Sequence, residues 1–259
     1  MNFLKKTSNT TPGTRHQRNL NKSILSKFNN IKKNLLLHIP ATAGRNKTGR
    51  ITVRHKGGGC KKKTHLLNTL QKFNGIVIKV MYDSKRKSFI SLNFDFNTKT
   101  FFKTIAIKNL FPGSLIRSNK KMNIFRLGYR TYLKNFSTGH IINTVSKGNK
   151  IIFAKSAGSF CQIIETKNSK TRLRLPSGEI TSINSNELAS IGKIGNMYNR
   201  LTVIGKAGRN RLKGIRPSTR GIAMNPVDHP HGGRSNKGMP PVTPWGLPTK
   251  NQPTKKRKK

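Results

Sequence analysis

FNGIVIKVM at 73–81, the polar turn DSKRK at 83–87 and ISLNFDF at 90–96 form the stretch that decides the fold class. The first run is apolar and β-branched, which is typical of a strand. Along the second run, apolar residues alternate with polar ones at Ile90, Leu92, Phe94 and Phe96. This period of two predicts a half-buried strand, so the two runs together predict a β-hairpin.

Short apolar runs continue outward from this hairpin through the centre of the chain. Further strands are predicted at 101–107, 151–155, 160–165, 171–175 and 201–204. Turn residues separate them at 111–113, 157–158 and 176–178, and 185–190 is predicted to begin a short helix. Strands at roughly ten-residue spacing predict a mainly β chain with two barrels of about 60–70 residues each. The predicted seam between the barrels lies near 132–140.

The charge of the chain restricts its partners. The 259 residues include 53 Lys and Arg but only 6 Asp and Glu, so the formal net charge is +47. Such a field opposes compaction of the chain and attracts polyanions. A membrane is not the expected partner, because no run approaches the ~18 consecutive apolar residues of a spanning helix. Nucleic acid, with its dense phosphate charge, is the expected partner.

The cysteines and carboxylates argue against an enzyme or a metal site. Cys60 and Cys161 form no CxxC pair, so neither a disulfide framework nor a four-ligand zinc site is expected, and a reducing compartment is the default. No two of the six carboxylates are neighbours in sequence, whereas a nuclease or polymerase needs clustered carboxylates for its metal ions. No cofactor is expected; Mg²⁺ enters only as part of an RNA environment.

Basic residues are concentrated at the two ends of the chain. Residues 1–70 contain 16 Lys and Arg and no acid, whereas 71–205 contain 23 and five acids. Residues 206–259 contain 14 and a single acid, Asp228. Both ends are rich in Gly, Pro, Asn and Thr and poor in periodic apolar pattern. We therefore expect a compact centre with two arms that become ordered on a polyanion.

The first candidate binding segment is GRNKTGRITVRHKGGGCKKK at 44–63. Its glycines allow close approach of backbone to phosphate, and successive N–H groups in such loops form anion-binding concavities. Arginine forks then hold phosphate oxygens. The segment contains no GxxxxGK[ST] loop, and its alternative interpretation is a solvated basic linker. The candidate contact residues are Arg45, Arg50, Arg54, His55, Lys56, Lys61, Lys62 and Lys63.

The second candidate segment spans 205–237 and contains basic residues at intervals of two to four. Its single Gly and Pro residues are predicted to break any helix. It ends in the loop NPVDHPHGG at 225–233, in which two X-Pro steps and two glycines predict a tightly shaped turn. The candidate contact residues are Lys206, Arg209, Arg211, Lys213, Arg216, Arg220, Asn225, His229, His231 and Arg234.

The two histidines of this loop have three possible uses. They are potential metal ligands, although His-x-His lacks a third ligand. They are potential proton-transfer groups, because histidine titrates near neutrality. The favoured interpretation is that they stack on bases or hydrogen-bond to bases and phosphates. Asp228 is predicted to orient a histidine or an arginine, or simply to cap the backbone of the turn.

These segments resemble the signature stretches of the universal large-subunit ribosomal protein number two family. The resemblance also includes TPGTRH at 11–16, AKSAGSFCQ at 154–162, LRLPSGE at 173–179, IGKIGN at 191–196 and PVTPWG at 241–246. It covers essentially the whole chain. It implies an OB-type barrel followed by an SH3-like barrel, with long basic extensions. The implied division is a basic rRNA-binding extension at 1–70, the OB-like barrel at 71–135, the SH3-like barrel at 136–205 and a basic extension at 206–259.

The resemblance implies a structural role in the large ribosomal subunit rather than enzymatic activity. The implied functions are large-subunit rRNA binding, support of the peptidyl transferase centre, tRNA placement and subunit association. The implied partners are large-subunit rRNA, neighbouring large-subunit proteins, the small subunit and nearby tRNA, with no membrane and no homo-oligomer. The loop at 225–233 resembles the one nearest the peptidyl transferase region, and His229 is interpreted as a positioning residue. The alternative is a general nucleic-acid-compacting basic protein.

Three stretches depart from the family pattern. Cys60 replaces the histidine that usually follows the glycine cluster, which removes one polar contact there. Residues 234–237 (RSNK) replace the usual glycine-rich acidic stretch, and 82–135 departs most. Trp245, the only tryptophan, is predicted either to stack on a base or to pack against the adjacent barrel.

The expected compartment is the mitochondrion, on a mitochondrial ribosome. Heavy use of Asn, Lys, Ile and Phe is typical of an AT-rich genome, and the motifs are bacterial in type. The acid-free first 30 residues resemble a transit peptide. The family resemblance already begins at Thr11, however, so no removable leader is expected. A plastid and the bacterial cytoplasm are the alternative compartments.

Overall fold

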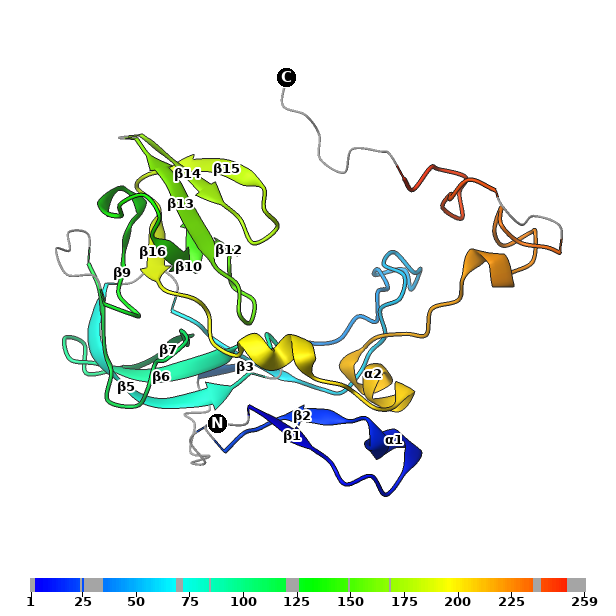
Figure 1. Ribbon diagram of the computed structural model, residues 1–259, viewed down its shortest axis with the longest axis horizontal. Helices are drawn as coiled ribbons and strands as arrows, with labels where there is room; N and C mark the ends of the chain where they lie inside the picture. Colours follow the sequence, from blue (N-terminus) through cyan, green and yellow to red (C-terminus); the bar gives the residue numbers. More distant parts are fainter. Residues whose placement is uncertain are drawn as a thin grey trace. The chain divides into compact units, whose positions relative to one another are not determined.

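The computed structural model describes residues 3–23, 25, 35–68, 72–83, 85–119, 126–148, 150–167, 169–234 and 239–250. The chain is mainly β, and its largest sheet joins ten strands (Figure 1). It divides into two compact units: unit 1 comprises 1–40 and 61–209, and unit 2 comprises 41–60 and 210–259. The four-part division predicted from the sequence stays a prediction.

The first half of the large sheet contains the predicted hairpin. Strands β5 (Phe73–Tyr82) and β6 (Phe89–Asp95) pair antiparallel, with Ile76 opposite Phe94. β7 (Phe101–Ile105) extends the sheet beside β6, and β8 (Leu115–Ser118) lies on the other side of β5. One cluster of buried apolar side chains in this half comprises Leu25, Phe73, Val77, Val80, Phe102, Ala106, Leu110 and Ile116.

The second half of the sheet is a larger set of short antiparallel strands. These strands are β9 (Arg130–Tyr132), β10 (Ile141–Asn143), β13 (Cys161–Thr166), β14 (Lys170–Arg174), β15 (Ile180–Asn184) and β16 (Leu188–Ile191). Their order is β15-β14-β13-β10-β16-β9, and a single parallel pair, Ser118 with Arg130, connects β9 to β8. β11 (Val145–Lys147) and β12 (Lys150–Phe153) form a separate hairpin.

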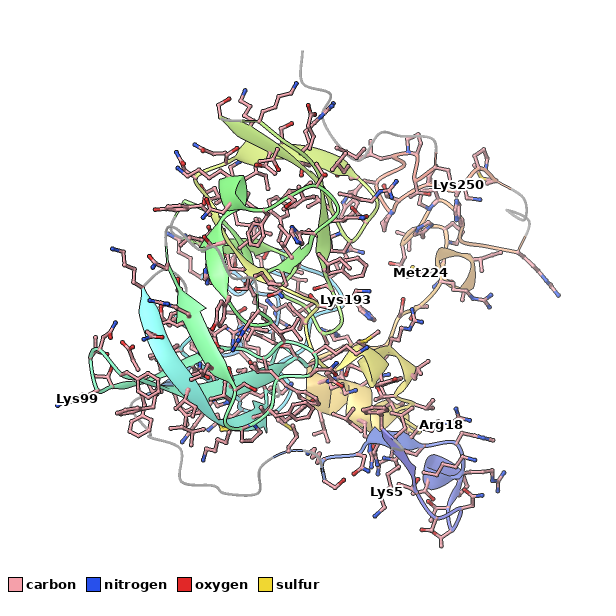
Figure 2. All side chains as sticks on the ribbon, turned by 60° about the vertical axis from the view of Figure 1, so that its left-hand side comes forward. Lys5, Arg18, Lys99, Lys193, Met224 and Lys250 are labelled. Carbon is pink, nitrogen blue, oxygen red and sulfur yellow. The ribbon has the colours of Figure 1, made fainter. Side chains whose placement is uncertain are left out.

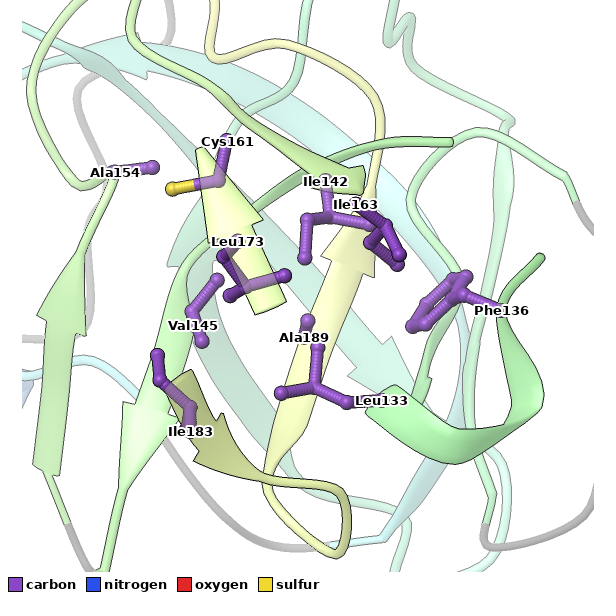
Figure 3. Close-up of a cluster of buried hydrophobic side chains, with 10 residues drawn as sticks. All are labelled: Leu133, Phe136, Ile142, Val145, Ala154, Cys161, Ile163, Leu173, Ile183 and Ala189. Atoms are coloured by element: carbon purple, nitrogen blue, oxygen red, sulfur yellow. The ribbon is translucent and has the colours of Figure 1, made fainter. Parts of the chain in front are cut away.

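Figure 3 shows the second hydrophobic core. Side chains from several strands and from η2, a 3-10 helix at Leu133–Asn135, meet in it. Leu133, Ile142 and Leu173 are completely buried. Burial raises the pKa of the Cys161 thiol to about 11, which makes this cysteine a core residue rather than a reactive one. The members are Leu133, Phe136, Ile142, Val145, Ala154, Cys161, Ile163, Leu173, Ile183 and Ala189.

The N-terminal region adds small elements to unit 1. β1 (Leu4–Lys6) pairs with β2 (Arg18–Leu20), and the short helix α1 (Pro12–Arg15) connects them. β3 (Leu36–His38) pairs with β4 (Lys63–His65). Leu25 belongs to the buried apolar cluster of the first half of the sheet. The basic N-terminal region therefore contributes an apolar side chain to that core.

Three secondary-structure predictions are wrong. The helix expected at 185–190 is instead a turn leading into β16, because Ala189 and Ser190 pair with β9 and this tertiary pairing overrides local preference. Residues 201–204, all of which the structure describes, do not form the expected strand. Leu201 ends η3, a 3-10 helix at Met197–Leu201, and only Val203 forms an isolated bridge.

The third wrong prediction concerns the second basic segment, where no helix was expected. The helix α2 (Ala207–Lys213) forms there. Gly208 lies in its first turn, where glycine is least damaging, and no Gly or Pro follows until Gly214. Gly214 has φ +89 and ends the helix. A second short element, the 3-10 helix η4 (Gly221–Ala223), precedes the 225–233 loop.

The alternation along β6 predicts the strand correctly but not its environment. Ser91, Asn93 and Asp95 are buried rather than solvated. β6 lies between β5 and β7, and its polar residues bond across the sheet. Ser91 Oγ lies 2.8 Å from Thr104 Oγ1, and Asn93 Nδ2 donates to the same hydroxyl at 2.9 Å.

A buried lysine connects the β3–β4 hairpin to the first half of the sheet. Lys103 on β7 is 1% exposed, and its Nζ donates to the Leu35 carbonyl at 3.2 Å. The same Nζ lies 3.0 Å from His65 Nδ1, which accepts when the imidazole is neutral. Burial lowers the pKa of His65, and the Lys103 cation lowers it further, while nearby Asp83 raises it and Arg86 lowers it slightly.

Acidification is expected to weaken this attachment. The pKa of His65 is lower in the folded chain than the ordinary value near 6.5, so its stabilising contribution is complete above about pH 6.5. That contribution is lost as the pH falls from there through the folded pKa. His65→Asn keeps an acceptor near the position of Nδ1 but does not titrate. In urea unfolding, this variant should lose less stability on acidification than the wild type, whereas His38→Asn, at an exposed position of β3, should behave like the wild type. Equal acid sensitivity of wild type and His65→Asn would contradict this account.

Candidate nucleic-acid interface

The two basic segments singled out from the sequence meet in unit 2. The Gly57 N–H donates to the Gly214 carbonyl at 2.8 Å, and the Cys60 N–H donates to the Leu212 carbonyl at 2.9 Å. In the opposite direction, the Arg216 N–H donates to the His55 carbonyl at 3.1 Å. Backbone pairing therefore joins two stretches that lie more than 150 positions apart in the sequence.

Glycine is required at this junction for a steric reason. A Cβ on Gly59 would lie 2.8 Å from the Gly214 nitrogen and 2.9 Å from the Leu212 carbonyl oxygen, and Gly59 has φ +67. Gly44 has φ +74, and a Cβ there would collide with the Val53 carbonyl oxygen. The glycines thus allow backbone to approach backbone, in addition to any approach to phosphate. Cys60, at the position where the sequence departs from the family pattern, is exposed and takes part in the junction through its N–H.

Unit 2 is strongly basic. Residues 41–60 contain five Lys and Arg, residues 210–259 contain twelve, and Asp228 is the only side-chain carboxylate in either range. Most of these cations therefore have no carboxylate in their own unit with which to pair. Fourteen of the predicted contact residues belong to this unit: Arg45, Arg50, Arg54, His55, Lys56, Arg211, Lys213, Arg216, Arg220, Asn225, His229, His231, Arg234 and Trp245.

The remaining predicted contact residues belong to unit 1. Lys61 and Lys63 are exposed, and Lys62 is half-buried beside β4. The exposed Lys206 lies against Gly13, and the half-buried Arg209 donates to Asn19 Oδ1 at 3.4 Å. Figure 2 shows nitrogen-tipped side chains extending outward from the ribbon, with Lys5 and Arg18 on the β1–β2 hairpin and Lys250 in unit 2.

Asn46 shapes the first basic loop, although the sequence analysis did not select it. Its Oδ1 accepts from the Thr48 N–H at 3.0 Å, the Thr48 hydroxyl at 2.7 Å and the Arg50 N–H at 3.0 Å. Arg45 Nη1 donates to the Gly49 carbonyl at 2.8 Å. The signal that predicts this turn is Asn followed two positions later by Thr, because Asn bonds to backbone just ahead of it.

The 225–233 loop is closed by its own backbone. The Asn225 carbonyl accepts from the N–H groups of Asp228 at 3.0 Å and His229 at 3.2 Å. The Gly232 N–H donates to the His229 carbonyl at 2.8 Å, and a Cβ on Gly232 would collide with Asn225. This confirms the tightly shaped turn predicted from the X-Pro steps and glycines.

The two histidines make contacts within this loop. His229 is 7% exposed, its ring lies against Gly221, and its Nδ1 accepts from the His231 N–H at 3.0 Å. His231 Nε2 lies 2.9 Å from the Pro240 carbonyl and 3.2 Å from the Val242 nitrogen. Within the described part of the chain, no group of three His, Cys, Asp or Glu side chains is arranged to hold a metal ion. Base or phosphate contact by His229 and His231 stays a prediction.

Asp228 is exposed, and among the described residues its carboxylate hydrogen-bonds to neither histidine. Its backbone N–H, together with that of His229, closes the turn on the Asn225 carbonyl. No helix in the described ranges is both long and apolar enough to cross a bilayer.

Comparison with known proteins matches two family models to this chain. The model described as "Ribosomal Proteins L2, RNA binding N-terminal domain" matches residues 32–118, and "Ribosomal Proteins L2, C-terminal domain" matches 126–246. The first match includes β3 to β8, and the second includes the strands from β9 onward and the 225–233 loop. The mainly β architecture and the two sheet halves are consistent with the predicted OB-type and SH3-like folds.

Several proteins resemble the chain over nearly its whole length. It is 42% identical to large ribosomal subunit protein uL2m of Reclinomonas americana, over 99% of this chain and 95% of that protein. It is 40% identical to large ribosomal subunit protein uL2 of Wolinella succinogenes, over 96% and 92% of the two chains. The protein of that name from a Wolbachia pipientis strain is 38% identical, over 96% and 93%.

Proposed function

This chain belongs to the ribosomal protein L2 family, and on that premise we propose that it is a structural constituent of the large ribosomal subunit that binds large-subunit rRNA. One structural observation supports this proposal most directly. Two remote basic segments are joined by backbone hydrogen bonds into one unit, and the residues of that unit that the structure describes include eleven Lys and Arg and one side-chain carboxylate. A preformed, uncompensated cationic surface of this kind suits a folded polyanion.

Affinity arises from many cation–phosphate contacts and the counterions that they release. Those contacts position the protein without reading sequence. Specificity arises from RNA shape, 2′-hydroxyl groups and unpaired bases. The closed loops around Asn46 and Asn225 present their backbone in a fixed conformation, so part of the ordering cost is met before binding.

The family membership supports finer roles. These are support of the peptidyl transferase centre, tRNA placement and subunit association, with neighbouring large-subunit proteins, the small subunit and tRNA as partners. The 225–233 loop is the element that approaches the peptidyl transferase region. His229 acts as a positioning residue, because its buried ring holds the loop through the His231 N–H. The protein works as a single copy, without enzymatic activity and without a cofactor other than Mg²⁺ of the surrounding RNA.

We place the protein on a mitochondrial ribosome, with a plastid and the bacterial cytoplasm as alternatives. The similarity to uL2m supports this compartment, and the Asn- and Lys-rich composition agrees with it. Similar identity to bacterial uL2 proteins supports the alternative. Fractionation of the source cells, with the chain detected in purified mitochondria and their ribosomes, distinguishes the compartments.

Co-sedimentation through a salt series tests the function. The full chain should sediment with large ribosomal subunits and remain bound through washes that remove loosely associated basic proteins. Its affinity for large-subunit rRNA should exceed its affinity for duplex DNA at the same salt concentration. Release at low salt, or equal binding to duplex DNA, would favour the nucleic-acid-compacting alternative instead.

A further inference from the structure

Trp245 lies at the tip of a tight hairpin in unit 2. The Gly246 N–H donates to the Thr243 carbonyl at 2.9 Å, which places the indole at the third position of a β-turn. The Leu247 N–H donates to the Thr243 hydroxyl at 3.1 Å, and the Thr249 N–H donates to the Pro241 carbonyl at 3.0 Å. The backbone that carries the ring is therefore held at several points.

One face of the indole is in contact with an arginine from the first basic segment. The Arg54 guanidinium carbon lies 4.7 Å from the centroid of the Trp245 ring, within the range of a cation–π contact. The side chain of Trp245 is nevertheless 67% exposed, and its neighbours Pro244 and Gly246 are small. A large, rigid aromatic surface thus faces solvent, and it is the most exposed aromatic side chain among the described residues.

The surroundings of the ring suit a nucleotide. Arg54 also borders an open hollow in which apolar side chains form one part and cationic or polar side chains form the rest. The hollow is lined by Ile51, Val53, Arg54, His55, Lys56 and Arg216. Aromatic faces stack on bases of every sequence, and nearby cations hold the backbone that connects those bases.

We propose that the Arg54–Trp245 pair is a stacking site for one unpaired nucleobase, which extends the stack on the open face of the indole. The proposal rests on the proposed function and adds the class of ligand: a single-stranded nucleotide rather than a helix backbone. Trp245 contacts the base, and Arg54 holds the indole in place while its charge attracts the adjoining phosphate. A duplex keeps its bases stacked within itself and therefore cannot occupy the site.

The single tryptophan makes the test direct, because all indole fluorescence of the full chain comes from this site. Single-stranded oligoadenylate should quench the fluorescence with saturation, whereas inorganic polyphosphate of equal charge should bind without comparable quenching. Equal quenching by polyphosphate, or RNA binding with unchanged fluorescence, would overturn the stacking site and leave the proposed function intact. Failure to bind any RNA would overturn both.

Variants of Trp245, Arg54 and Phe111 distinguish the contribution of base stacking from the contribution of charge and from a loss of the fold. Trp245→Ala should weaken binding of labelled single-stranded RNA roughly tenfold, with duplex RNA binding unchanged, and Trp245→Phe should recover part of the loss. Arg54→Lys should give a smaller loss, because lysine keeps the charge but not the planar stacking group. Phe111→Ala removes another exposed aromatic side chain, 61% exposed in unit 1, and should change neither affinity. An equal loss for Phe111→Ala, or an equal loss of duplex binding in Trp245→Ala, counts against the site.

Discussion

Replacing Arg211, Lys213 and Arg216 together by glutamine is expected to weaken binding of large-subunit rRNA by on the order of a thousandfold. All three side chains are exposed in unit 2, which contains a single side-chain carboxylate. If each contributes about 1.5 kcal/mol through a charged hydrogen bond to phosphate, the combined loss is about 4.5 kcal/mol. The fold should be preserved, because the junction near these residues uses backbone groups, such as the Arg216 N–H.

The salt dependence distinguishes direct phosphate contact from a general loss of charge. With three fewer contacts, the slope of log affinity against log salt concentration should become shallower by about two for single-stranded RNA. The matched control replaces Lys147, Lys170 and Arg174, which are exposed on β11 and β14 of unit 1, by glutamine. It removes the same charge and should cost much less affinity. Equal losses in both triple variants would show that net charge, and not unit 2, governs binding.

The local pattern of apolar residues correctly predicted the strands that are formed by long, strongly apolar runs. Phe73–Met81 and its partner run form β5 and β6 as expected. The helix predicted at 185–190 did not form, because Leu188, Ala189 and Ser190 pair with β9 residues 56 to 60 positions earlier in the chain. No local sequence signal indicates that pairing. The strand predicted at 201–204 did not form either, because in the described chain only Val203 pairs with another segment, through an isolated bridge to Arg18.

Residue type was also an incomplete guide to burial. Lys103 and Arg130 are among the basic residues of the chain, yet both are buried in unit 1. Desolvation lowers the pKa of Arg130 to about 10, and among the described residues its Nε and Nη2 atoms have no hydrogen-bond partner. A high count of cations predicts a polyanionic partner but does not identify which cations reach it.

The candidate interface was predictable as two segments but not as one unit. Glycines and cations at 44–63 and 205–237 indicated phosphate-binding loops. The bonds that join these segments run between backbone groups of Gly57, Cys60, Leu212 and Gly214, which leave no side-chain pattern to read. The composition of both arms also predicted that they become ordered only on a polyanion. For the free protein this stays a prediction, and the hydrogen exchange of the junction amides tests it against a preformed junction.

Gly59→Ala is expected to break the junction between the two segments of unit 2 at a cost of about 3 kcal/mol. The left-handed backbone at φ +67 costs a residue with a Cβ roughly 1–2 kcal/mol. The new Cβ would also lie 2.8 Å from a backbone nitrogen and 2.9 Å from a carbonyl oxygen, so the two backbone segments must move apart. Loss of the Gly57 and Cys60 hydrogen bonds adds roughly 1 kcal/mol each.

Two other glycines of the same segment separate these contributions. Gly49 has φ +79 and nothing within 4 Å of its would-be Cβ, so Gly49→Ala should incur only the backbone cost. Gly58 has equal space and no positive φ, so Gly58→Ala should be nearly neutral. Hydrogen exchange of the Gly57, Cys60 and Arg216 amides measures the junction itself. Protection should survive at all three amides in Gly58→Ala and Gly49→Ala and disappear in Gly59→Ala, with weaker rRNA binding in that variant alone. If protection persists in Gly59→Ala, the close approach of these backbones does not hold unit 2 together, and the case for a preformed binding surface fails with it.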